Sequence, residues 1–139
     1  MTYRGGCFCG AIRVAFTSRL SPRRLPIRWC LCSFCRKHGA RSTSDPRGRL
    51  RFRVRRARLS RFDGGRLICA HCGVYVGMVQ RIDGRLYGVI NANALERGME
   101  TRVFGEPHDA GGQSAARKAA RRRALWTPAH LTGISIAAK

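Results

Sequence analysis

Seven cysteines in three tight groups constrain this chain more than any other feature of its sequence. Three of them crowd into six residues and two pairs flank these three: Cys30, Cys32 and Cys35, with Cys7 and Cys9 before them and Cys69 and Cys72 after them. An odd number of thiols in C-x-C and C-x-x-C spacings is typical of metal ligation and does not suit a disulfide framework. The alternative is a redox or metal-trafficking protein whose central thiols oxidise reversibly.

The spacing divides the seven thiols into a group of four and a group of three. A C-x-C turn and a C-x-x-C-G knuckle complete a tetrahedron when they pack against each other, which predicts one four-sulfur structural zinc. The three central thiols then hold a second zinc, whose fourth position could take water or a substrate thiol. The expected ligands are Cys7, Cys9, Cys69 and Cys72 at the structural site, and Cys30, Cys32 and Cys35 at the second site.

A histidine could instead close the second site as a Cys₃His centre, which is the rule for zinc without a catalytic role. The chain has four candidates for this ligand: His38, His71, His108 and His130. His38 is favoured by spacing, because it follows the three cysteines directly. The sequence leaves both the open and the closed site as alternatives.

The pattern of apolar residues predicts a mainly β domain. Residues 49–55 alternate strictly, with apolar side chains on one face and arginines, most simply solvated, on the other. We expect further strands at 11–16 and 59–68, the second broken by a turn at 63–65. Residues 74–90 predict a hairpin that turns near Asp83 and Gly84. No segment before residue 110 shows a convincing helical period.

The composition changes near residue 110 and divides the chain in two. The expected zinc domain covers residues 1–110, and residues 111–139 form a basic helical extension or tail. Residues 113–125 are rich in good helix formers and have almost no apolar stripe, which predicts a solvated helix. Trp126 and Leu131 could anchor its end to the body of the protein.

The formal charge of +21, from 28 basic and 7 acidic residues, favours anionic partners. Because only three of the basic residues are lysine, a general arginine bias explains the charge equally well, and nucleic acid is the less favoured partner. The N-terminus lacks a signal-peptide pattern, and no apolar run approaches the length of a membrane span. We therefore expect a cytoplasmic protein without a membrane partner.

The cysteine motifs resemble those of the glutathione-dependent formaldehyde-activating enzyme family, which also includes centromere protein V. The matching segments are residues 5–13, 30–40 and 69–73. The resemblance implies a β-tent type fold of several curved antiparallel sheets held by zinc, to which the composition of residues 113–125 adds a short C-terminal helix. It also implies a structural zinc on the group of four cysteines and a catalytic zinc on the group of three, two Zn²⁺ per chain.

The resemblance further implies a carbon–sulfur lyase that joins a thiol, glutathione or a similar one, to formaldehyde or another small aldehyde. Three thiolates and one Zn²⁺ carry a net charge of −1, so a nearby cation should help to retain an anionic thiol substrate. Arg36, Lys37 and Arg41 follow the ligands directly and are the candidates for this role. The alternative function is a non-catalytic zinc module that binds nucleic acid through its basic surface, including residues 117–123.

Overall fold

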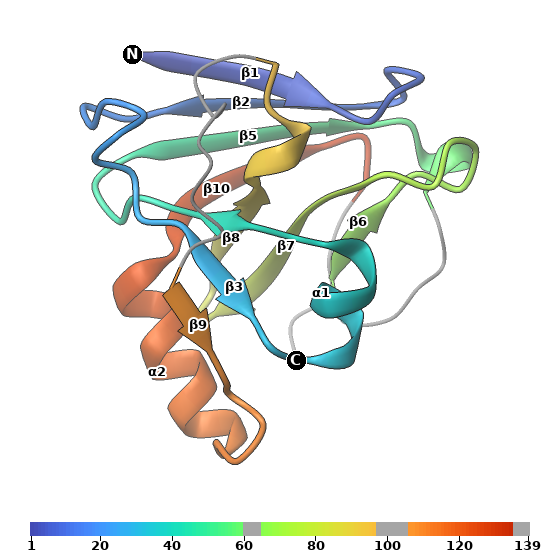
Figure 1. The fold of residues 1–139 in the computed structure, drawn as a ribbon. Coiled ribbons are helices and arrows are strands. Elements are labelled where there is room, and N and C mark those ends of the chain that lie inside the picture. The colour runs from blue at the N-terminus through green and yellow to red at the C-terminus, as the bar shows by residue number, and fades with distance from the viewer. Residues whose placement is uncertain (60–64, 97–105, 135–139) are drawn as a thin grey trace.

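The computed structural model describes residues 1–59, 65–96 and 106–134 (Figure 1). Within these ranges the chain is mainly β, as the sequence predicts, and its strands join in one sheet. The strands are β1 (Thr2–Gly6), β2 (Ile12–Thr17), β3 (Arg28–Cys30), β4 (Ser42–Thr43), β5 (Arg49–Val54), β6 (Arg66–Ile68), β7 (Tyr75–Ile82), β8 (Arg85–Asn91), β9 (Glu106–His108) and β10 (Thr127–Thr132). The helices are α1 (Ser33–His38) and α2 (Ala115–Leu125), with single 3-10 turns η1 (Arg56–Arg58) and η2 (Ala92–Ala94).

The strand order is β1-β2-β5-β10-β8-β4-β3-β9, and β6 and β7 extend from the other edge of β8. β8 is the central strand, because β7 pairs along one edge of it while β10 and β4 pair in succession along the other. Most pairs are antiparallel, as expected from the resemblance. The pairs β5–β10 and β3–β9 are parallel, a departure from a purely antiparallel sheet.

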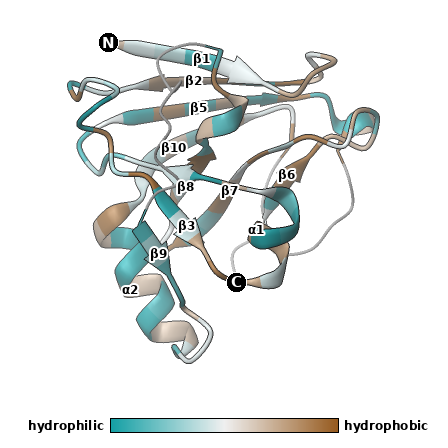
Figure 2. Ribbon diagram, in the orientation of Figure 1, coloured by the Kyte–Doolittle hydropathy of each residue, from teal (hydrophilic) through white to brown (hydrophobic). Residues whose placement is uncertain are grey.

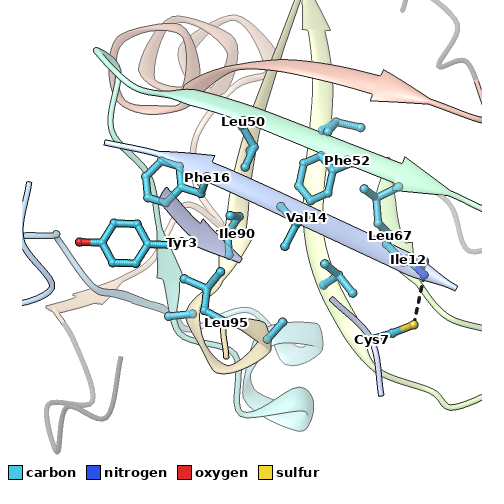
Figure 3. Close-up of a cluster of buried hydrophobic side chains, with 14 of the residues drawn as sticks. Tyr3, Cys7, Ile12, Val14, Phe16, Leu50, Phe52, Leu67, Ile90 and Leu95 are labelled. Atoms are coloured by element: carbon cyan, nitrogen blue, oxygen red, sulfur yellow. Dashed lines mark hydrogen bonds between the residues drawn. The ribbon is translucent and has the colours of Figure 1, made fainter. Parts of the chain in front are cut away.

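The core lies between the strands β1, β2 and β5 and the part of the sheet built on β7 and β8. Strand alternation sends one face of β2 and β5 inward, which Figure 2 shows as alternating hydrophilic and hydrophobic bands. Phe52 is fully buried, and a Cβ atom on Gly77 of β7 would lie 3.0 Å from its ring. Glycine at this position therefore lets the two parts of the sheet approach closely. Figure 3 shows the packed side chains, among them Phe16, Leu50 and Ile90.

The hairpin predicted for residues 74–90 is present as β7 and β8. Its two turn residues are Asp83 and Gly84, with φ of 50° and 78°. Positive φ at both positions is the signature of a type I′ turn, whose twist matches that of the flanking strands. The turn expected at 63–65 falls largely outside the described residues, and β6 begins at Arg66.

Helix α1 was not expected from the sequence. The capping interactions at its two ends account for its formation better than any helical repeat of apolar residues. The Cys32 side chain caps the N-terminus by accepting from the backbone N–H of Cys35. Gly39, in the left-handed conformation at φ 60°, ends the helix, and the N–H of Ala40 donates to the carbonyl of Cys35. A six-residue helix defined by its two caps carries no apolar repeat for a sequence pattern to detect.

The segment expected as a separate extension after residue 110 belongs to the sheet wherever it is described. Helix α2 forms close to the predicted 113–125, and β10 then lies between β5 and β8. Trp126 is buried and Leu131 packs against the core, as expected of anchoring residues. Thr127 is fully buried and its Oγ1 accepts from the backbone N–H of Asp45 at 2.8 Å. The change of composition near residue 110 is therefore not a structural boundary. No helix in the described ranges is long and apolar enough to cross a membrane.

Candidate metal centres and the adjoining cavity

The four predicted structural ligands come together where the β1–β2 turn meets the turn before β7. Their sulfur atoms all lie within 4.8 Å of one another: Cys7, Cys9, Cys69 and Cys72. The Sγ of Cys9 lies 3.7 Å from that of Cys7 and 3.5 Å from that of Cys69. Four sulfurs at about 2.3 Å from a central zinc lie about 3.8 Å apart in a tetrahedron. The predicted grouping is confirmed, and its spacing fits an ion of this size.

Backbone turns prepare this group for negative charge. The backbone N–H of Ile12 donates to the Cys7 Sγ at 3.2 Å (Figure 3), and that of Cys72 to the Cys69 Sγ at 3.5 Å. Gly73, at φ 79°, closes the second turn with a hydrogen bond to the Cys69 carbonyl. Burial nevertheless raises the pKa of the Cys7 thiol to about 11, so a bound cation is what would make this side chain a thiolate at neutral pH.

The second group forms where β3 passes into α1. The sulfurs of Cys30, Cys32 and Cys35 also lie within 4.8 Å of one another. Cys35 is buried, whereas Cys32 is exposed and accepts from the Cys35 backbone N–H at 3.4 Å. The side-chain hydrogen bond from Cys35 lowers the pKa of Cys30 to about 5, and the pKa of Cys35 is raised in turn.

No histidine completes the second group, although all four histidines lie among the described residues. His38, the candidate favoured by spacing, packs against Phe34 with ring centroids 4.3 Å apart and lies near Tyr75. His108 is the β9 register partner of Cys30, and its buried Nε2 has no hydrogen-bond partner. The donor set that the described residues offer is three sulfurs, which fits a zinc with a position left for another ligand.

A cavity of about 180 Å³ lies beside the three cysteines, between β3, β7 and α2. The three thiols line it, as do the apolar side chains of Met78, Val89 and Trp126. Its other polar lining is cationic apart from Ser42, the buried Tyr75 and His108, whose pKa is lowered by burial, and no aspartate or glutamate is among the described residues that line it. The basic side chains are Arg28, Arg66, Lys118, Arg121 and Arg122, with His108 beside them.

These cations are crowded and partly desolvated. Burial, and then the charge of Arg121, lowers the pKa of Arg28 to about 10. Burial also lowers the pKa of Arg121 and of Arg122. Arg122 donates to Gln80 Oε1 while its buried Nε lacks a partner, and Arg28 donates to Ser44 Oγ. An anion in the cavity would reduce the repulsion between these basic side chains, so the cavity favours the binding of a negatively charged group.

Helix α2 supplies three of these cations from one face. Lys118, Arg121 and Arg122 recur at helical spacing and are half-buried, whereas Arg117 and Arg123 are exposed. The helix was expected to be solvated because it lacks an apolar stripe. In the structure its inward face is a basic stripe that covers the cavity, and this i, i+3, i+4 recurrence is the signal that sequence reasoning missed.

The three side chains proposed from sequence to bind an anionic substrate do not line the cavity. Arg36 and Lys37 are exposed on α1. Arg41 donates from Nε to Asn93 Oδ1 at 2.8 Å. Adjacency to the ligands in sequence was the reason for choosing them, but α1 ends at Gly39 and carries the chain out of the cavity. Its cations come from β3, β6 and α2 instead.

Comparison with known proteins supports the architecture. No protein-family model matches the chain, and no curated protein matches it. Among solved structures it is similar to the crystal structure of a Rhodobacter sphaeroides protein that was a Northeast Structural Genomics target. The two are 28% identical, the match covers 75% of this chain and 97% of that one, and the TM-score is 0.54. A second protein of known structure thus shares this mainly β arrangement.

Proposed function

We propose that this protein is a zinc-dependent carbon–sulfur lyase of the glutathione-dependent formaldehyde-activating type. It would join glutathione, or a similar anionic thiol, to formaldehyde or another small aldehyde. The observation that carries this proposal is the cavity in which three cysteine thiols meet five basic side chains. Thiolates are soft ligands suited to zinc, and guanidinium groups suit the carboxylates of a peptide thiol.

Each part of the cavity has a role in this proposal. Cys30, Cys32 and Cys35 would hold the zinc, which when bound supplies the positive charge that keeps a substrate thiol deprotonated at neutral pH. Arg28 and Arg121 would hold the substrate carboxylates by paired hydrogen bonds. The substrate sulfur forms a bond to the aldehyde carbon while the carbonyl oxygen takes up a proton. The reverse reaction breaks the same carbon–sulfur bond and returns the proton.

The lining of the cavity also has an apolar part that suits this chemistry. Met78, Val89 and Trp126 line the cavity together with the three thiols. Electrostatic attraction between the cations and a carboxylate is stronger in such surroundings than in bulk water. The basic side chains that line the cavity would therefore bind the carboxylates of the substrate, and the three cysteines would lie at the end where its sulfur reacts.

The test measures the exchange of ¹³C-formaldehyde with its glutathione adduct by NMR, using zinc-loaded protein. Arg121→Gln removes a cation that lines the cavity, and Arg117→Gln removes an exposed one from the same helix. We expect Arg121→Gln to raise KM for glutathione about tenfold or more, since a charged hydrogen bond contributes about 1.5–3 kcal/mol. Arg117→Gln should leave KM unchanged, and kcat should change little in either variant.

A thiol without carboxylates provides the matched substrate control. With 2-mercaptoethanol, Arg121→Gln and the wild type should behave alike, because the interaction that the variant removes is with the carboxylate. Cys32→Ser should abolish exchange with both thiols. A wild-type rate no faster than the spontaneous addition of glutathione to formaldehyde would refute the enzyme, whatever the variants do.

A further inference from the structure

The first four neighbouring strands of the sheet present a basic outer face. β1, β2, β5 and β10 lie side by side (Figure 1), and their inward side chains fill the core. Their exposed positions alternate with these buried ones. Five of the exposed residues are arginines and form what we call the arginine face: Arg4, Arg13, Arg49, Arg51 and Arg53.

The strand register brings like charges together on this face. Arg13 of β2 stands directly opposite Arg53 of β5. Arg51 lies between Ala15 on one side and His130 on the other. Like charges directly opposite each other destabilise a sheet, so the pairing of Arg13 with Arg53 is unfavourable for the strands. An anionic partner that spans the strands would reduce this repulsion.

Among the described residues, acidic side chains do not compensate for the charge of the arginine face. In the three described ranges, no ion pair involves any of the five arginines. Glu96 is the acidic side chain beside the face, where it lines one of its hollows. A general preference for arginine over lysine accounts for the residue type. It does not account for five arginines gathered on one sheet face where, in the part of the chain that the structure describes, Glu96 is the one carboxylate beside them.

Two hollows lie along the arginine face, and both are lined by Arg13 and Arg53. The larger, of about 450 Å³, also includes Arg55 and Thr132. The smaller, of about 320 Å³, adds Arg4 and Arg51. An anionic group in either hollow would meet at least three guanidinium groups. Guanidinium forks match phosphate oxygens in pairs, which makes arginine well suited to this role.

We propose that the arginine face binds the phosphate backbone of nucleic acid. The arginines follow β5 at about 6.8 Å intervals and are about 4.8 Å apart across neighbouring strands, so a charged strand can contact several at once. A membrane surface fits less well, because peripheral binding also needs exposed apolar side chains to enter the lipid. Neither of the two hollows is lined by the large apolar side chains exposed in the described residues, Met1, Phe8, Leu31 and Leu125, although Phe8 shares a separate hollow with Arg13.

The face is distinct from the cavity beside the cysteine trio. None of the five arginines lines that cavity, and none of the cavity cations belongs to β1, β2, β5 or β10. Binding of nucleic acid is therefore independent of thiol chemistry, and each can be tested without the other. Contacts to phosphates fix no base sequence, so binding should be sequence-independent and salt-dependent.

The test measures fluorescence anisotropy of a 20-base-pair random-sequence DNA duplex between 50 and 200 mM NaCl. The variant Arg13→Gln/Arg51→Gln/Arg53→Gln removes three charges from the face. The matched control, Arg23→Gln/Arg24→Gln/Arg36→Gln, removes three exposed charges from elsewhere and leaves the same net charge. The face variant should bind at least tenfold more weakly at 100 mM NaCl. Its slope of log affinity against log salt should fall by about 2–3, at about 0.9 for each phosphate that the protein no longer neutralises.

The control variant should keep the wild-type slope and bind within about threefold of the wild type. Equal weakening in both variants would mean that net charge alone attracts DNA, and would overturn the proposal. Absence of duplex binding at 50 mM NaCl would overturn it too, as would binding only to phosphatidylserine vesicles. Circular dichroism and zinc content verify that each variant is folded, and the exchange activity of the face variant should match the wild type.

Discussion

Replacing Cys9 by serine should cost more unfolding free energy than replacing Cys32, although both side chains are exposed. The reason is the length of chain that each metal site closes. Cys9 and Cys69 are 60 positions apart, whereas the second group lies within the short segment from Cys30 to Cys35. In the chain-entropy treatment of cross-links, a loop of about 60 residues contributes about 4 kcal/mol and one of about six residues about 2 kcal/mol. Loop length alone thus predicts a difference of about 2 kcal/mol.

The pair is well matched for this comparison. Serine is a good N-cap, so Cys32→Ser keeps an acceptor for the N–H of Cys35 at the start of α1. The sulfur of Cys9 lies against those of Cys7 and Cys69, so its replacement weakens binding of the zinc that ties residues 7–9 to residues 69–72, and the cost predicted from loop length is reached when that zinc is lost. The two substitutions therefore differ mainly in which metal site they weaken.

The assay is urea unfolding of both variants at one fixed free-zinc concentration, followed by far-UV circular dichroism and accompanied by zinc analysis. With a slope of about 2 kcal/mol/M, the midpoint of Cys9→Ser should lie about 1 M below that of Cys32→Ser. After chelation of zinc the two midpoints should converge, because neither loop is then closed. Equal midpoints in zinc, or a difference that persists after chelation, would refute the loop-closure reasoning.

Two further predictions concern the tyrosine beside the cysteine trio and the last strand. Burial raises the pKa of Tyr75 above its ordinary value of 10.0, so above that pH the unfolded state ionises this phenol and the folded state does not. The contribution of Tyr75 to stability is complete below pH 10 and is lost as the pH rises further. Urea unfolding should therefore show a smaller drop in the free energy of unfolding between pH 9 and pH 11 for Tyr75→Phe than for the wild type. Equal drops in the two proteins would contradict this assignment. Ending the chain after residue 110 should abolish cooperative thermal unfolding, because β5 and β8 lose the strand between them; a sharp transition in that fragment would show that residues 1–110 fold alone.

The parts of the fold and site that the sequence predicted are those encoded over short distances. Strict alternation identified β5, and an Asp-Gly pair identified the β7–β8 turn. The division of seven thiols into four and three followed from spacing, because each C-x-C or C-x-x-C turn has one geometry that presents two sulfurs together. Such local patterns do not depend on how distant segments meet.

The features that were missed depend on distant segments meeting. The cavity cations come from positions as far apart as Arg28 and Arg122, whereas the expected Arg36 and Lys37 follow Cys35 on α1 and are not among the residues that line the cavity. β10 has only two apolar aliphatic side chains and a proline, so its place at the middle of the sheet follows from its neighbours. Its parallel pairing with β5 joins residues about 80 positions apart, beyond the reach of any local pattern.

The position of β10 also sets the order in which the protein can assemble. During synthesis, β5 and β8 leave the ribosome well before β10, the strand that lies between them in the fold. Until β10 is made, one edge of each of these two strands has unpaired backbone groups. The pairing that joins them spans most of the chain and forms slowly for that reason. Until residue 132 emerges, the nascent chain is therefore exposed to strand-mediated association, and the pairing of β10 with β5 and β8 is a late step in folding.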